Sequence, residues 1–218
     1  MKTPVRCLIT GFEPFGGSTL NPSQAVVEAI EAGRFVSCRA ELHTALLPVD
    51  TSSIGAVIET LWQRFDPDFV LHLGESSKAD RLTLERVALN LLDFDSPDNA
   101  GRVIVDEPID PVGPAARFAT LGVRALRDRL AERGIDTALS LSAGAYLCNQ
   151  ALYLSLARAQ QRGGRVVGFV HLPSLPDQVK RKERKAPAMP IDQLIGQLQT
   201  LLDHAIAPFH AHESDTAH

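Results

Sequence analysis

Short apolar runs alternate with amphipathic segments along most of this chain, and that alternation limits the fold more than any other feature. The runs 5–10, 69–73 and 166–170 have the length and composition of buried strands. The segment 54–65 repeats its apolar residues every three to four positions, which is typical of an amphipathic helix. We therefore expect an α/β protein, a three-layer α/β/α sandwich with a mostly parallel central sheet.

Capping residues mark where helices begin and end. Asn21 can cap a helix that begins at Pro22, and Gln24 has the position that a capping box requires. The pair Gly163 and Gly164 ends a helical segment that begins near Leu147. Further helices are expected at 123–130 and 191–202, and further extended segments at 36–47, 82–89 and 137–141.

The length of 218 residues predicts one domain with a substantial core. We expect this domain to span residues 1–208 and the polar tail 209–218 to be disordered. Residues 91–114 are rich in Pro, Asp and Gly, which indicates a long ordered loop or a small excursion from the sheet.

Charge and cysteine content exclude several classes of partner. A net charge of -4 and a pI near 6.0 give no reason to expect nucleic-acid binding, and the basic run 180–185 is expected to be a solvated face or a mobile loop. No run approaches the ~18 apolar residues of a membrane span, and no signal-peptide pattern is seen before the first strand, so we expect a cytoplasmic protein without membrane partners.

Cys7, Cys38 and Cys148 are odd in number and widely spaced, which suits reduced thiols. Their spacing fits no metal site, and no cofactor is expected.

Four chemically informative features follow predicted strands. Gly11–Gly17 comes after the strand 5–10, Glu75–Arg81 after the strand 69–73, and Cys148 after the strand 137–141, while His171 ends the strand 166–170. Because the carboxyl ends of parallel strands meet at one edge of a sheet, we expect all four features to share that edge.

Cys148 stands where a strand gives way to a helix. In the first turn of a helix, the positive end of the helix dipole stabilises a thiolate. A nearby imidazole would complete a thiolate–imidazolium pair, and His171 is the best candidate because it lies where a buried strand meets a loop. The alternatives are an inert buried thiol and a structural histidine.

Glu85 and Arg86 place charges within an apolar, strand-like segment. Buried charges are costly unless they are paired. Glu85 can therefore belong to a structural ion pair, reach solvent at a strand end, or orient His171, and the spacing leaves these alternatives open.

The turn TGFEPFGG, residues 10–17, matches neither common glycine-rich phosphate motif and is followed by no lysine. Phe12 and Phe15 fit the wall of an apolar pocket better than a nucleotide site. They can also be anchors that pack the loop on the core.

Four motifs together resemble one known family. TGFEPFGG, TLERVALN with Glu85, SAGAYLCN with Cys148 and GFVHLP with His171 occur in the order and spacing of pyroglutamyl-peptidase I, a family of cysteine peptidases. The similarity extends from about residue 5 to about residue 205.

The resemblance implies a compact α/β/α fold and a metal-independent exopeptidase that removes an N-terminal pyroglutamyl residue from peptides with a blocked N-terminus. It implies that Cys148 is the nucleophile, His171 the general base and acid, and Glu85 the carboxylate that orients the histidine. Phe12 and Phe15 match positions in the loop that flanks the pyroglutamyl ring. A cytoplasmic homodimer or homotetramer is also implied.

The chain departs from the family on the substrate side. Family members commonly carry a Gly/Arg-rich loop such as GQAGGR where this chain has GESSKADR, residues 74–81, and commonly asparagine where it has Leu141. Glu75 therefore brings a carboxylate to the expected pocket, where it favours hydrogen-bond donors and disfavours exposed acceptors. Two alternatives stay open: a cysteine amidohydrolase of the same fold with a different small acyl-amide substrate, and a non-catalytic binding protein on this scaffold.

Overall fold

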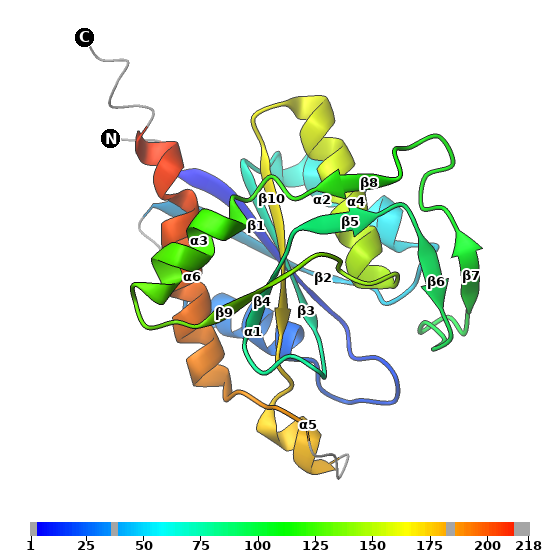
Figure 1. Cartoon of the computed structure of the whole chain (residues 1–218), viewed down its shortest axis with the longest axis horizontal. Coiled ribbons are helices and arrows are strands. Elements are labelled where there is room, and N and C mark those ends of the chain that lie inside the picture. The colour runs from blue at the N-terminus through cyan, green and yellow to red at the C-terminus, as the bar shows by residue number, and fades with distance from the viewer. Residues whose placement is uncertain (1–3, 36–38, 182–185, 212–218) are drawn as a thin grey trace.

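The computed structural model describes residues 4–35, 39–181 and 186–211. A six-stranded sheet forms the centre of the molecule (Figure 1). Its strands, in spatial order, are β2 (Ala40–Leu47), β1 (Val5–Phe12), β3 (Phe69–Glu75), β10 (Val166–Leu172), β4 (Leu82–Glu85) and β9 (Thr137–Ser140).

Four of these strands run parallel to one another, and the other two run the opposite way. β2, β1, β3 and β10 are parallel, β4 is antiparallel to β10, and β9 is parallel to β4. Residues 76–81 join β3 to β4, and so short a link cannot hold the crossover that parallel strands require. The prediction of a mostly parallel sheet is confirmed. β9 runs opposite to β3 and β10, so Cys148 does not follow a strand that is parallel to them. The four features nevertheless come together as expected, since Phe15, Glu75, Cys148 and His171 line one cleft.

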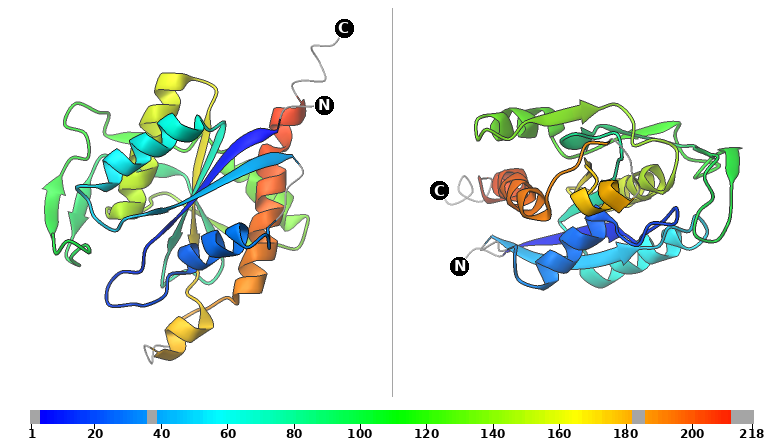
Figure 2. Two further views of the ribbon diagram at one scale, coloured as in Figure 1. Left: turned by 180° about the vertical axis from the view of Figure 1, so that it is seen from behind. Right: turned by 90° about the horizontal axis from the view of Figure 1, so that it is seen from below.

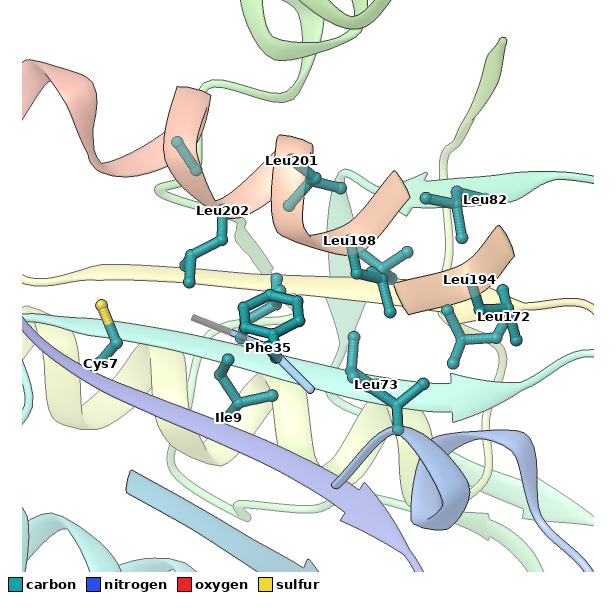
Figure 3. Close-up of a cluster of buried hydrophobic side chains, with 14 of the residues drawn as sticks. Cys7, Ile9, Phe35, Leu73, Leu82, Leu172, Leu194, Leu198, Leu201 and Leu202 are labelled. Atoms are coloured by element: carbon teal, nitrogen blue, oxygen red, sulfur yellow. The ribbon is translucent and has the colours of Figure 1, made fainter. Parts of the chain in front are cut away.

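Helices cover both faces of the sheet, which confirms the three-layer arrangement. One hydrophobic cluster joins the sheet to α1 (Pro22–Glu31), α3 (Val123–Ala131) and α6 (Ile191–Ala211), and a second joins it to α2 (Ile54–Phe65) and α4 (Leu147–Arg162). Seen from behind in Figure 2, α1 lies beside α6 and α2 lies beside α4. Figure 3 shows Leu194, Leu198 and Leu201 of α6 over the strands, and all three are buried because they share one stripe of the helix.

The predicted excursion at residues 91–114 contains a two-stranded sheet at the periphery (Figure 1). β6 (Leu92–Phe94) pairs antiparallel with β7 (Ile104–Glu107), and β5 (Val87–Leu89) pairs with β8 (Ala116–Phe118). The buried carboxylate of Asp98 fixes the loop between β6 and β7. It accepts hydrogen bonds from the backbone and hydroxyl of Thr51 and from the backbone N–H groups of Ala100 and Arg102.

Several predicted boundaries need correction. Asn21 does cap α1, since its side chain accepts from the Ser23 N–H at 3.0 Å. Gln24, however, donates to Glu28 on the next turn, so the predicted capping box is wrong. α6 continues through Pro208 to Ala211, beyond the predicted start of the tail, because Phe209 still packs against the core.

Other predictions fall on residues outside the described ranges. These are the start of the strand at 36–38 with Cys38, most of the basic run at 182–185, and the tail at 212–218. Within the described ranges, no helix is long and apolar enough to cross a membrane. A short helix, α5 (Pro176–Arg181), follows β10 and becomes important at the site.

Candidate active site

Cys148, His171 and Glu85 come from three different elements and lie together. The antiparallel pairing of β10 with β4 sets His171 opposite Thr83, so Glu85, two residues further along β4, is its diagonal neighbour on the same face. The Nδ1 of His171 lies 2.7 Å from Oε1 of Glu85. Glu85 is buried, with 2% of its surface exposed, and this ion pair compensates part of the cost of burying its charge.

The surroundings of His171 favour its protonated form. Burial lowers the pKa of His171, but the charge and hydrogen bond of Cys148 and the contact with Glu85 together outweigh burial and raise that pKa. Cys7, the other cysteine in the described ranges, has no such partner, and burial raises the pKa of its thiol to about 12. An inert buried thiol therefore describes Cys7, whereas Cys148 is half-buried beside an imidazole.

The start of α4 holds Cys148 in place. Asn149, the next residue, is fully buried. Its side-chain oxygen accepts from the N–H of Leu89 at 2.8 Å, and its side-chain amide donates to the carbonyls of Leu89 at 2.8 Å and Leu91 at 2.9 Å. The N-cap of α4, Tyr146, makes no side-chain capping bond. The first N–H groups of the helix therefore have no side-chain partner at the N-cap and can act as donors to an anion beside Cys148.

Gly74 makes room for the thiol. A Cβ atom at this position would lie 2.9 Å from Sγ of Cys148 and 2.7 Å from Cζ of Phe169, both far inside van der Waals contact. Only glycine lets β3 approach the cysteine this closely.

Two hollows meet at the sulfur. A cleft of about 630 Å³ lies over the three side chains, with Thr83, Ser140 and Lys78 among its lining residues. Beside it is a narrow pocket of about 20 Å³ that shares Phe15, Glu75, Tyr146 and Cys148 with the cleft, and we call it the acyl pocket. It is lined by Phe12, Phe15, Asn21, Val49, Glu75, Tyr146, Leu147 and Cys148. All three residues predicted to bind substrate, Phe12, Phe15 and Glu75, thus lie in the acyl pocket together with Cys148.

Ser174, which follows β10, and Gln178 of α5 fix Glu75 through two hydrogen bonds. The hydroxyl of Ser174 donates to Oε1 at 2.8 Å, and the side-chain amide of Gln178 donates to Oε2 at 3.1 Å. Gln178 also donates to the carbonyl of Leu20, in the loop that carries Phe15. Both Ser174 and Gln178 are buried, so Glu75 has one defined orientation at the pocket.

Sequence reasoning missed some of these residues and misjudged another. Ser174 and Gln178 carry no sequence signal, because their role depends on how α5 packs. Tyr146 could have been noticed as the aromatic residue two positions before Cys148; its ring lies 6.2 Å from that of Phe15, and burial raises the pKa of its hydroxyl to about 12. Leu141 was expected to alter the surroundings of the site, but 70% of its surface is exposed and it lines neither hollow.

In the part of the chain that the structure describes, no group of three or more His, Cys, Asp or Glu residues could hold a metal ion. The site itself offers a thiol, an imidazole and a carboxylate. An α/β/α fold with these three groups in contact defines the class as cysteine hydrolases.

Comparisons with known proteins give the family. A sequence model of the pyroglutamyl peptidase family matches residues 5–207. The pyrrolidone-carboxylate peptidase of Chromobacterium violaceum is 41% identical over 184 residues, covering 83% of this chain and 82% of the relative. That of Pyrococcus furiosus is 36% identical over 187 residues, covering 85% and 89%. The chain belongs to the pyroglutamyl peptidase family of cysteine peptidases.

Solved structures agree with this assignment. The pyrrolidone carboxyl peptidase of Thermus thermophilus superposes with a TM-score of 0.82 at 43% identity, covering 91% of this chain and 99% of that one. The Pyrococcus furiosus enzyme superposes with a TM-score of 0.87 at 34% identity, covering 92% and 98%.

Proposed function

We propose that the protein hydrolyses the amide bond that follows an N-terminal pyroglutamyl residue, with Cys148 as nucleophile, His171 as general base and acid, and Glu85 as the carboxylate that orients the imidazole. The observation that carries this proposal is the position of His171, which interacts with Cys148 on one side and with the buried Glu85 on the other. Membership of the pyroglutamyl peptidase family supports the substrate class.

The first half of the reaction forms a thioester. The sulfur of Cys148 attacks the acyl carbonyl carbon, and the N–H groups at the start of α4 stabilise the resulting oxyanion. As the tetrahedral intermediate collapses, the C–N bond breaks and the departing amine takes the proton of His171. The ion pair with Glu85 keeps the imidazole in the orientation that both steps require.

The second half releases the acid. His171, now neutral, accepts a proton from water, and the resulting hydroxide attacks the thioester carbonyl. The C–S bond breaks, the thiol is restored, and pyroglutamate leaves. The acyl pocket supports this assignment, since Phe12, Phe15 and Tyr146 give a small ring apolar walls while Glu75 can accept the ring N–H.

The test is turnover of pyroglutamyl-7-amido-4-methylcoumarin under reducing conditions. We expect the wild-type enzyme to release the coumarin, Cys148→Ala to be inactive with an unchanged circular dichroism spectrum, and the matched control Cys7→Ala to keep its activity. Turnover by Cys148→Ala would refute the nucleophile. A folded wild-type enzyme without turnover would refute the substrate.

The proposal also covers the location and the oligomeric state of the enzyme. A cytoplasmic location fits the free thiols of Cys7 and Cys148. A homodimer or homotetramer fits the strongly exposed apolar side chains Val103, Val105 and Val112 of the excursion 91–114 and Phe118 of β8. Light scattering after size-exclusion chromatography tests the assembly, and a monomer at micromolar concentration would refute it.

A further inference from the structure

The acyl pocket offers one anionic acceptor, Glu75, while its amide and hydroxyl donors are each engaged in at least one hydrogen bond. The amide of Asn21 donates to the Glu13 carbonyl at 3.0 Å, and the hydroxyl of Tyr146 donates to the Pro97 carbonyl at 3.3 Å. Glu75 is different, because each carboxylate oxygen accepts one hydrogen bond and has capacity for another. A ring bound here can therefore be recognised through its own N–H donors, whereas a ring carbonyl would depend on the second N–H of the Asn21 amide.

The charges around the pocket favour a cation. The carboxylate of Glu75 and the thiol of Cys148 line it and are negative when ionised, whereas the phenol of Tyr146, with a pKa of about 12, stays neutral at pH 7. The protonated His171 lies in the adjoining cleft. The cationic side chain of Lys78 lines the outer cleft and not the acyl pocket. The aromatic rings of Phe12, Phe15 and Tyr146 add faces that attract positive charge.

A neutral lactam does not use this arrangement fully. Pyroglutamate offers a single N–H to Glu75 and brings a ring carbonyl that needs a donor. An N-terminal proline has the same five-membered ring, but its nitrogen is a secondary ammonium with two N–H donors and a full positive charge, and it lacks the ring carbonyl. It would form a charge-assisted hydrogen bond with Glu75, which is stronger than a neutral one.

We propose that the same site also hydrolyses peptides and amides with an N-terminal proline, through an ion pair between the ring ammonium and Glu75. This inference rests on the proposed function, because it uses the same nucleophile and acyl pocket. The bond changes are the same: the sulfur of Cys148 bonds to the prolyl carbonyl carbon as the amide C–N bond breaks, and His171 gives its proton to the departing amine. Water then cleaves the thioester, and free proline leaves.

Three fluorogenic amides of 7-amino-4-methylcoumarin test the proposal at pH 7. The prolyl amide carries the ring ammonium. The tetrahydrofuran-2-carbonyl amide has a ring of the same size with a neutral oxygen in place of the nitrogen. The pyroglutamyl amide reports the proposed family activity. Each is assayed with the wild-type enzyme, with Glu75→Gln, and with the matched control Glu107→Gln, which removes an exposed carboxylate of β7 that lines neither hollow.

We expect the wild-type enzyme to cleave the prolyl amide at least about tenfold faster, in kcat/KM, than the tetrahydrofuran-2-carbonyl amide. In Glu75→Gln, the ratio of prolyl to pyroglutamyl kcat/KM should fall at least about tenfold, because an amide replaces the anion that pairs with the ammonium. Glu107→Gln should leave this ratio unchanged.

The outcomes separate this inference from the proposed function. Turnover of the pyroglutamyl amide without turnover of the prolyl amide overturns the inference and leaves the proposed function intact. Prolyl turnover that Glu75→Gln does not reduce overturns the role of the ion pair. If the folded enzyme cleaves neither amide, both proposals are refuted.

Discussion

Gly74→Ala is the substitution whose effect the structure specifies most closely. The added Cβ would lie 2.7 Å from Cζ of Phe169 and 2.9 Å from Sγ of Cys148. Carbon atoms in contact are normally about 3.5–4.0 Å apart, so the first of these contacts is about 1 Å too short. Phe169 is fully buried and packs against the ring of His171, with the ring centroids 4.7 Å apart, so it cannot simply move away.

Two consequences follow from this crowding, one for stability and one for activity. Overpacking of a filled core costs about 1–3 kcal/mol, and urea unfolding should report a loss in that range. A shift of the sulfur by about 1 Å should lower kcat about 100-fold on a pyroglutamyl amide.

The matched control is Gly55→Ala in α2. Its new Cβ would make only an ordinary 3.7 Å contact with Leu154, and replacing a helical glycine should stabilise the protein by about 0.5–1 kcal/mol with activity unchanged. Wild-type kcat and stability in Gly74→Ala would refute the account of how β3 approaches the thiol.

Three further substitutions test other parts of the structure. Glu85→Gln should lower kcat at least about 100-fold, because His171 loses the anion that orients it and favours its protonated form; a kcat within threefold of wild type would contradict this role. The buried His72 has a pKa lowered to about 3, so it stays neutral in the folded protein while the unfolded chain binds a proton below pH 6.5. Its contribution to the free energy of unfolding should therefore fall by about 1.4 kcal/mol per pH unit from pH 6.5 down to about pH 3, and urea unfolding of His72→Gln should show a correspondingly flatter acid dependence. Asp98→Ala should destabilise the protein by about 3 kcal/mol, because it leaves buried donors of the peripheral loop without their acceptor; a loss below about 0.5 kcal/mol would show that the loop is held in another way.

The sequence supported the prediction of the layers well, because local patterns determine them. The apolar stripe of α6 and the runs that became β3 and β10 need only the periodicity of a helix or a buried strand. The direction of β4 and β9 was not predictable in this way. It depends on which strand β4 pairs with, and β10, which it pairs with, lies about eighty residues further along the chain.

In the candidate site too, local features could be predicted from the sequence and contacts between distant segments could not. Cys148 could be proposed from the sequence because its strand-to-helix junction is a local feature. The pairing of Glu85 with His171 became visible only when two distant strands were set side by side. The contacts of Ser174 and Gln178 with Glu75 depend on how the short helix α5 packs, and no sequence pattern predicts that packing.

The central claim is that Cys148 carries the acyl group during turnover. Acid quenching of the enzyme during hydrolysis of a pyroglutamyl amide, followed by proteolysis and mass spectrometry, tests it directly. The account predicts a pyroglutamyl adduct on the peptide that contains Cys148, and none on the peptides that contain Cys7 or Cys38. Turnover with no adduct on Cys148, together with an adduct on another residue, would contradict it.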